Sequence, residues 1–309
     1  MASHLSAGGI LVVGSLNMDL VVRASRHPRV GETILGTAFH TFPGGKGANQ
    51  AVAAARLGSN VCMIGRVGSD AFGDEMAAIV EREGIDTTFL LRDPDKPTGV
   101  ALITVDDAGQ NNIVVVPGAN GCLSPDDIRS ARPAFANASL LLLQLEIPLE
   151  TVRQAVAAAH EHGMQVILNP APARELDPEL LASIDYLVPN QHELELLTGS
   201  PSVQDGVEKL RSSGVNRVIV TLGEEGAYTA DESGEQYIPA FSVEAVDTTA
   251  AGDAFMGGFA AGILRGLTPA RAAVWGAAAG ALAVTRQGAL PSLPTREEFD
   301  NFLAIRHVL

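Results

Sequence analysis

The amino-acid sequence predicts an α/β protein with a doubly wound, mostly parallel central sheet and helices on both faces. Two observations carry this prediction. Short runs rich in β-branched residues recur with almost no polar alternation, which is typical of strands covered on both faces. Stretches with helical periodicity separate these runs, and strands that alternate with helices form parallel sheets.

The strands and helices expected from these patterns follow one another along the chain. The apolar runs lie at residues 10–16, 61–67, 140–145, 166–168, 186–188 and 218–222. The helical stretches lie at residues 50–57, 74–83, 151–161, 203–212, 253–264 and around 270–284. Glycines stand where several of these helices should end and are expected to cap them: Gly58, Gly84, Gly163, Gly214 and Gly266.

Two segments, 20–42 and 98–117, depart from this alternation. They contain Thr- and Val-bearing stretches and a turn signal at 107–109, with no helical stretch between strands. We expect antiparallel strands outside the main sheet, which need a second layer from the main domain or another subunit. No internal repeat or low-complexity linker is visible, so residues 1–309 are expected to form a single domain with these segments inserted in it.

The composition excludes several classes of function. The 309 residues include 21 basic and 36 acidic side chains, a net charge of −15, which disfavours nucleic acid and anionic membranes as partners. Neither a secretion signal at residues 1–9 nor an apolar run of about 20 residues is found. With two cysteines and no HExxH or GxSxG motif, neither a zinc site nor a hydrolase nucleophile is indicated. We expect a cytoplasmic protein.

Polar residues gather where the predicted strands end. Alone, each is more often a turn or cap residue, because Asn and Asp are common in both roles. In open α/β sheets, however, ligands bind beyond the carboxyl ends of the strands. A whole rim of polar residues therefore predicts a ligand site: Asn17, Asp19, Glu146, Asn169, Asn190, Glu193 and Gly223.

A glycine-rich segment, GGKGAN at 44–49, precedes an Ala-rich helix. Glycines let the backbone approach a ligand closely, although the same letters can form a simple tight turn. Lys46 favours the binding interpretation, because the chain has only three lysines. The segment is not a Walker A motif, since Gly47 follows Lys46.

A second small-residue segment, DTTAAGD at 247–253, opens the helix predicted at 253–264. Its small side chains leave N–H groups accessible at the positive end of the helix dipole, which favours an anion there. Asp253 then has two interpretations. It is either a first-turn Asp that stabilises the helix, or a carboxylate that accepts a proton from an attacking hydroxyl. The residues alone leave both open.

In this order, Asn17 with Asp19, GGKGAN, NQHE at 190–193 and DTTAAGD resemble the motifs of the PfkB-type carbohydrate kinases, and within them the ribokinase branch. Further matches lie at 144–146, 169–174, 188–190, 221–223 and 285–289, and the likeness runs from about residue 10 to the end. The resemblance implies a ribokinase-like fold. It also implies that 20–42 and 98–117 form a lid that closes over the sugar and pairs with its counterpart in a homodimer.

The activity that the resemblance implies is ATP-dependent phosphorylation of D-ribose at the 5-hydroxyl, giving D-ribose 5-phosphate and ADP. Asp253 would be the base, and the backbone N–H groups of Ala250, Ala251, Gly252 and Asp253 would stabilise the transferring phosphoryl group. The residues implied to bind the sugar are Asn17, Asp19, Gly45, Lys46, Asn49, Glu146 and Asp253.

Two metal ions are also implied by the resemblance. Asn190 and Glu193 would organise Mg²⁺ and the phosphates. A monovalent cation, usually K⁺, would be bound near Asp247, Thr249, Ala283, Arg286, Gly288 and Ser292, several of them through carbonyl oxygens. The implied ATP-binding residues are Asn190, Thr221, Gly223, Gly226 and Gly252.

Two positions depart from the family pattern. Ala250 stands where relatives often have Gly, which narrows the allowed backbone angles, and Ala277 stands where some have a His near the adenine. The alternatives are a kinase for deoxyribose, another sugar or a nucleoside, and a non-catalytic sugar or nucleotide sensor. An aromatic content of 5% disfavours a nucleoside pocket, and a retained Asp253 disfavours a sensor.

Overall fold

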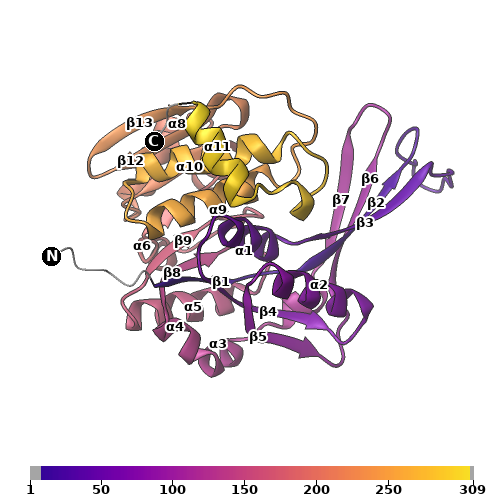
Figure 1. Ribbon diagram of the computed structural model, residues 1–309, viewed down its shortest axis with the longest axis horizontal. Coiled ribbons are helices and arrows are strands. Elements are labelled where there is room, and N and C mark those ends of the chain that lie inside the picture. The colour runs from indigo at the N-terminus through magenta and orange to yellow at the C-terminus, as the bar shows by residue number, and fades with distance from the viewer. Residues whose placement is uncertain (1–7, 307–309) are drawn as a thin grey trace.

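The computed structural model describes residues 8–306 and contains a nine-stranded sheet with helices on both faces (Figure 1). The strand order is β13-β12-β11-β10-β9-β8-β1-β4-β5. Neighbours from β11 to β5 are parallel, and β12 and β13 add an antiparallel edge. The strands are β1 Gly9–Val13, β4 Val61–Gly68, β5 Asp86–Asp93, β8 Ala138–Leu143, β9 Gln165–Leu168, β10 Tyr186–Leu187, β11 Val218–Thr221, β12 Gly226–Asp231 and β13 Gly234–Pro239. The predicted doubly wound, mostly parallel sheet is confirmed.

Three strands of this sheet were not expected from the sequence. β5 is an edge strand with polar residues at both of its ends, so it lacks the unbroken apolar run of a central strand. β12 and β13 form a hairpin with glycine at the start of each strand. The first predicted strand, 10–16, is also shorter than expected and ends at Val13.

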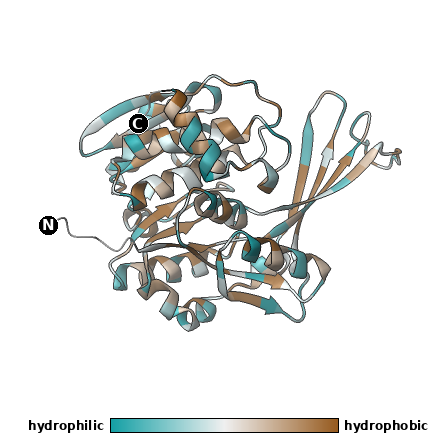
Figure 2. Ribbon diagram, in the orientation of Figure 1, coloured by the Kyte–Doolittle hydropathy of each residue, from teal (hydrophilic) through white to brown (hydrophobic). Residues whose placement is uncertain are grey.

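The helices cover the sheet in two layers, each with its own apolar core. One core includes residues of α1, α2, α9, α10 and α11, and the other includes residues of α3 to α8. Figure 2 shows the brown central strands between these layers. The five predicted glycine caps are confirmed, each with a positive φ. The helices are α1 Lys46–Arg56, α2 Ala71–Arg82, α3 Pro125–Ser130, α4 Arg132–Ala136, α5 Leu149–Glu161, α6 Pro178–Ala182, α7 Gln191–Thr198, α8 Val203–Ser212, α9 Ala251–Leu264, α10 Pro269–Ala283 and α11 Arg296–Ile305.

A separate four-stranded sheet projects from this body (Figure 1). It is built from the two segments that were expected to form extra strands, in the order β3-β2-β6-β7. The outer pairs are antiparallel as expected, but β2 and β6 are parallel. The reason is that β2 follows β1 and β6 follows β5, so both leave the carboxyl edge of the main sheet in the same direction. The strands are β2 Asn17–Arg23, β3 Ala38–Gly44, β6 Gly99–Val105 and β7 Asn111–Val116.

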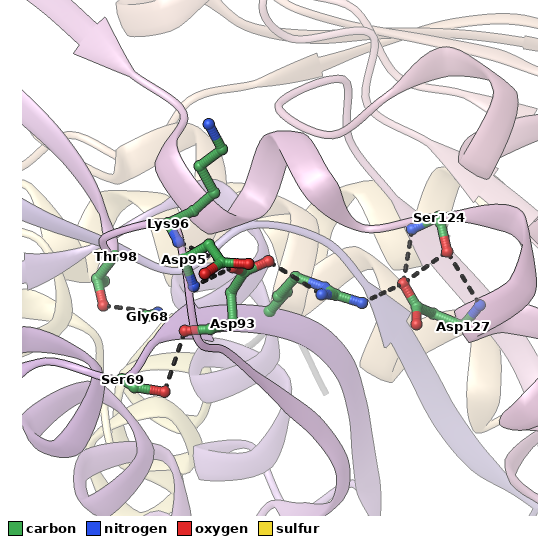
Figure 3. A network of polar contacts seen from close by, with 9 residues as sticks. Gly68, Ser69, Asp93, Asp95, Lys96, Thr98, Ser124 and Asp127 are labelled. Atoms are coloured by element: carbon green, nitrogen blue, oxygen red, sulfur yellow. Dashed lines mark hydrogen bonds and ion pairs between the residues drawn. The ribbon is translucent and has the colours of Figure 1, made fainter.

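Polar contacts hold the base of the small sheet against the main body (Figure 3). Thr98, immediately before β6, accepts a hydrogen bond from the Gly68 N–H at 3.0 Å and donates to Asp70. Asp93, at the end of β5, accepts from the N–H groups of Asp95 and Lys96 at 3.0 and 2.8 Å. These contacts fix the point at which the chain passes from one sheet to the other.

Within the described residues, no helix is both long enough and apolar enough to cross a bilayer. Residues 1–7, in which the sequence indicates no secretion signal, lie outside the described part of the chain, as do 307–309.

Candidate active site

A cleft of about 290 Å³ lies beyond the carboxyl ends of β9, β10 and β11, where the first turns of α1, α7 and α9 meet. This is the edge at which the sequence predicted a ligand site. Most of its lining residues are polar or small. They are Lys46, Asn169, Ala171, Val188, Asn190, Glu193, Thr221, Gly223, Ala250, Gly252, Asp253 and Met256.

The amino end of α9 is prepared for an anion. Ala250 has a φ of 58°, the only positive φ at a non-glycine among residues 8–306. This conformation costs an L-residue about 1–2 kcal/mol, so the surrounding structure must impose it. A Cβ added at Gly252 would meet no atom within 4 Å, so the space beside this residue is open.

Three of the four N–H groups predicted to bind the phosphoryl group are free to do so. Within the described residues, no acceptor is recorded for the N–H groups of Ala250, Gly252 and Asp253. The Ala251 N–H instead donates to the Thr248 carbonyl at 3.2 Å. Helix N-termini with unsatisfied donors favour negative charge, so this end of the cleft suits a phosphate.

Asp253 supplies the last of these N–H groups, and the residue is 8% exposed. Its Oδ2 accepts a hydrogen bond from Asn49 Nδ2 at 2.8 Å, and its Oδ1 accepts one from Gln50 Nε2 at 2.9 Å. Both amides come from α1, which packs closely against α9. A Cβ on Gly257 would lie 2.3 Å from Ala53 Cβ, so the glycine allows this approach.

A second carboxylate, Glu146, contacts two of the other predicted sugar-binding residues, Asn17 and Lys46. Its Oε2 accepts hydrogen bonds from Ser15 Oγ at 2.5 Å, the Lys46 N–H at 3.2 Å and Asn17 Nδ2 at 3.4 Å. Asn17 is also held by Asn120, whose Nδ2 donates to Asn17 Oδ1 at 2.8 Å. Glu146 thus joins the end of β8 to the first residues of β2 and α1.

Five charged groups share this region, and the pKa values of three of them, Asp19, Glu193 and Lys46, are raised. Burial, with the nearby carboxylates of Glu146 and Asp253, raises the pKa of Asp19 to about 7, although Lys46 opposes the shift. Burial also raises the pKa of Glu193, although the hydrogen bond from the Asn190 N–H and the charge of Lys46 oppose the shift. Burial alone would lower the pKa of Lys46, but the surrounding carboxylates outweigh it and raise the pKa.

The Asp19 shift predicts a pH-dependent stability. Between about pH 4 and 7 the folded protein holds this proton more tightly than the unfolded chain, so stability falls as pH rises through that window and stays lower above it. The change in Tm that Asp19→Asn causes should therefore be about 2–4 °C more positive at pH 8 than at pH 5. Thermal melts at the two pH values test this. The exposed Glu75→Gln serves as control, and equal effects of Asp19→Asn at both pH values would contradict the prediction.

Asn190 and Glu193 form a reciprocal capping box at the start of α7. Asn190 Oδ1 accepts from the Glu193 N–H, and Glu193 Oε2 accepts from the Asn190 N–H, both at 2.8 Å. No cluster of three or more His, Cys, Asp or Glu side chains able to hold a metal occurs in the described residues. The Asn190 and Glu193 side chains nevertheless fit Mg²⁺, because this ion keeps several waters and needs few protein carboxylates when phosphates are present.

Part of the predicted K⁺ set is assembled around Asp247. Its Oδ2 accepts the Gly288 N–H at 2.9 Å, and its Oδ1 accepts from Thr249 Oγ1 at 2.6 Å. These hydrogen bonds lower the pKa of Asp247 despite its partial burial. The Arg286 guanidinium pairs with Glu298 at 2.6 Å, so only its backbone is available to a cation.

The other two residues of that set are buried. The Ala283 carbonyl accepts the Arg286 N–H at 3.2 Å, and Ser292 Oγ donates to the Ala289 carbonyl at 2.8 Å. Carboxylate, hydroxyl and carbonyl oxygens are the ligand types that hard cations prefer, so the chemistry of this set is compatible with such a cation.

The predicted ATP-binding residues are partly assembled. Asn190 and Thr221 pair as a parallel β-bridge and line the cleft with Gly223 and Gly252. Gly226 does not line this cleft: it is buried at the start of β12, where a Cβ would lie 2.1 Å from the Ile238 carbonyl oxygen. This close approach gives Gly226 a packing role, and its contact with ATP stays a prediction.

Sequence reasoning missed several polar residues that hold the site together: Ser15, Gln50, Asn120 and Gln144, each at most 1% exposed. A signal existed for two of them. Gln50 directly follows the glycine-rich segment, and Gln144 lies two residues before Glu146. Asn120 belongs to a short 3₁₀ segment, Gly118–Cys122, that carries no sequence signal.

Comparison with known proteins agrees with this geometry. The family model described as pfkB family carbohydrate kinase matches residues 8–296. A deoxyribokinase of Salmonella typhi is 42% identical over 302 residues, covering 96% of this chain and 99% of its own. A ribokinase of Haemophilus influenzae is 41% identical over 299 residues, covering 95% and 98%. The structure of an Arabidopsis thaliana ribokinase complexed with ribose and ATP is 35% identical, with a TM-score of 0.88 and coverage of 96% and 98%.

These similarities extend over nearly the whole chain, and they confirm the resemblance that the motifs indicated. The chain belongs to the pfkB family of carbohydrate kinases and is an enzyme, a sugar kinase of the ribokinase type.

Proposed function

We propose that the protein transfers the γ-phosphoryl group of ATP to the 5-hydroxyl of D-ribose, producing D-ribose 5-phosphate and ADP. One observation carries the proposal: a buried Asp253 carboxylate, held by two amides, lies directly beside the free N–H groups at the start of α9. A base and an anion site within one helical turn are what transfer to a hydroxyl requires.

The sugar occupies the end of the cleft around Lys46. Carboxylates accept hydrogen bonds from hydroxyls while amides and ammonium groups donate them, so this mixed set suits a polyhydroxylated ligand. Asp253 takes the proton of the attacking hydroxyl, and the neighbouring groups orient the ring. The residues assigned to the sugar are Asn17, Asp19, Gly45, Lys46, Asn49, Glu146 and Asp253.

ATP occupies the end formed by β11 and α7, along Asn190, Thr221, Gly223 and Gly252. Its γ-phosphate meets the N–H groups of Ala250, Gly252 and Asp253, with the helix dipole stabilising the charge. Ala251 is left out, because its N–H is already paired. Mg²⁺ would be held near Asn190 and Glu193, where it would neutralise phosphate charge.

A monovalent cation, K⁺ in the first instance, is proposed to bind at Asp247, Thr249 and the carbonyl-rich segment beyond Ala283, including Arg286, Gly288 and Ser292. This segment is tied to the start of α9, since the Val284 carbonyl accepts the N–H groups of Val246 and Asp247 at 2.7 and 3.1 Å. The cation would therefore stabilise the loop that presents the anion site.

The small sheet is proposed to act as the lid and to pair with a second copy. Its outer face exposes apolar side chains: Val22, Phe39, Leu102, Val114 and Val116, with exposures from 36% to 61%. Solvated apolar patches of this kind favour contact with another protein surface. ATP is a cytoplasmic metabolite, so the proposed activity implies a cytoplasmic enzyme.

Glu146→Ala should weaken sugar binding more than it slows turnover. The substitution removes the acceptor shared by Ser15, Asn17 and the Lys46 N–H, so the sugar end of the cleft loses its organisation. We expect KM for the sugar to rise by about 10- to 100-fold, as for the loss of a charged hydrogen bond, with KM for MgATP nearly unchanged. An unchanged KM for the sugar in steady-state assays would refute this assignment.

The function itself is tested by sugar-dependent ADP formation from MgATP, with and without K⁺. The panel contains ribose, deoxyribose, fructose and adenosine. Ribose is expected to give the highest kcat/KM, with an increase on adding K⁺. Preference for fructose or adenosine would overturn the proposed substrate, and silence across the panel from folded protein would favour a sensor.

Deoxyribose is the second candidate, because the Salmonella deoxyribokinase is as similar to this chain as the ribokinases are. The two sugars differ by the 2-hydroxyl alone. A site that hydrogen-bonds this group should reject deoxyribose strongly, since its own polar groups would be left unpaired. A kcat/KM for deoxyribose equal to or above that for ribose would select this candidate and leave the proposed base and anion site intact.

A further inference from the structure

A network of three amide side chains, Gln50, Gln144 and Asn169, lies behind Asp253, and of the three only Asn169 lines the cleft. Gln50 and Gln144 are fully buried. Gln50 Nε2 donates to Asp253 Oδ1 at 2.9 Å and to Asn169 Oδ1 at 3.2 Å. Gln144 Nε2 donates to Gln50 Oε1 at 2.6 Å, and Asn169 Nδ2 donates to the Val188 carbonyl at 2.9 Å.

The direction of every hydrogen bond in this amide network follows from Asp253. An ionised carboxylate only accepts, so Gln50 must turn its NH₂ group toward it. Both hydrogens of that group are then used, on Asp253 and Asn169, and Gln50 Oε1 must face Gln144. Asn169 must in turn direct its own NH₂ group to the Val188 carbonyl. No member can flip its amide without breaking one of these hydrogen bonds.

The Gln144 end of the amide network is held in place by packing. Gln144 Oε1 is buried and has no hydrogen-bond partner among residues 8–306. It lies against Gly14, where an added Cβ would be only 2.2 Å from this oxygen. Leaving a buried acceptor unpaired costs stability, so its neighbours must hold the Gln144 amide in place.

We infer that Gln50 is a positioning residue, which Gln144 and Asn169 hold in one orientation so that it fixes the Asp253 carboxylate for the reaction. The inference rests on the proposed role of Asp253 as base. Asn49 holds the other carboxylate oxygen and is also assigned to the sugar. Gln50 donates from within the protein and lies outside the set of cleft-lining residues, so its contact with Asp253 does not depend on substrate.

The test is steady-state kinetics of Gln50→Met, which keeps the length of the side chain and removes its donors. We expect kcat to fall by about 10- to 100-fold, the cost of a misplaced catalytic group, with KM for sugar and for MgATP each within twofold. The acid limb of the kcat profile should also move to higher pH, because loss of a donor favours the protonated carboxyl group.

Gln144→Met provides an independent test, since Gln144 does not touch Asp253. It should lower kcat by about 3- to 10-fold, a part of the Gln50→Met effect. The double variant should be no slower than Gln50→Met alone, because Gln144 acts only through Gln50. Multiplying effects on kcat would overturn the inference. Should Gln50→Met fail to fold, kcat, the two KM values and the acid limb of the kcat profile are measured for Gln144→Met instead. An unchanged kcat and acid limb in that variant would then overturn the inference.

Two controls separate the inference about Gln50 from the proposed role of Asp253 as base. Thr151→Val removes a buried hydrogen bond to the Leu123 carbonyl, between residues that do not line the cleft, and should lower Tm without changing kcat. Asp253→Asn is assayed alongside. Turnover near wild type in Asp253→Asn would overturn both the proposed base and the inference. Loss of turnover in Asp253→Asn, with kcat and the acid limb unchanged in Gln50→Met, would overturn the inference alone.

Discussion

Asp253→Asn is expected to reduce kcat by about 10²- to 10⁴-fold, the range typical of losing a general base. The asparagine fills the same space, and its single side-chain oxygen can still accept from Gln50, but it cannot take a proton from the attacking hydroxyl. Calorimetric titration with MgATP and with sugar should give Kd values within a few-fold of wild type, because the free N–H groups of Ala250 and Gly252 remain.

A matched control addresses the other interpretation of Asp253, that it only stabilises the helix dipole. Asp205 occupies the same third position of its helix, α8, and is exposed to solvent. Asp205→Asn should cost about 0.3–1 kcal/mol of stability and leave kcat unchanged. If Asp253→Asn behaved like Asp205→Asn, with a small loss of stability and normal turnover, Asp253 would not be the base.

Gly257→Ala should destabilise the fold and disturb the site together. The new methyl group would lie 2.3 Å from Ala53 Cβ and 2.8 Å from the Ala54 backbone nitrogen, neither of which can move alone. Alanine gains about 1 kcal/mol in helix propensity, but the collision between α1 and α9 is larger. We expect Tm to fall by about 5 °C or more, and kcat to fall as the Asn49 and Gln50 amides retreat from Asp253.

Gly280→Ala in α10 is the control, because the atom nearest to the new Cβ would be the Ala251 carbonyl oxygen at 3.2 Å. The gain in helix propensity roughly offsets that mild contact, so Tm should change little. Thermal melts followed by fluorescence of Trp275, the single tryptophan, compare the two variants directly. Equal melting temperatures for Gly257→Ala and wild type would show that α1 and α9 can separate without cost.

Periodicity predicted the buried parts of the fold well. The runs at 61–67 and 140–145 became β4 and β8, because strands covered on both faces leave an uninterrupted apolar pattern. The same logic missed β5, whose edge position exposes polar residues that break the run. It also assigned antiparallel pairing throughout the small sheet, whereas the parallel contact of β2 with β6 follows from where both strands leave the main sheet.

The candidate site shows the same division. Its anion-binding segment and Asp253 could be proposed from the sequence, because small residues before a helix have local physical consequences. The sequence could not show that the Ala251 N–H pairs with the Thr248 carbonyl, or that Gly226 is buried. Both features depend on atoms that folding brings close together.

The sequence by itself therefore determined the class of fold, the edge of the sheet that carries the site and the residue types available there. Strand patterning and helix starts are local properties that a chain of letters expresses directly. Only the tertiary structure decided that Asn49 and Gln50 reach Asp253, more than 200 residues away, and that Gln144 fixes Gln50 from behind. Those contacts arise from the close approach of α1 and α9 at Gly257, which packing sets and no local pattern encodes.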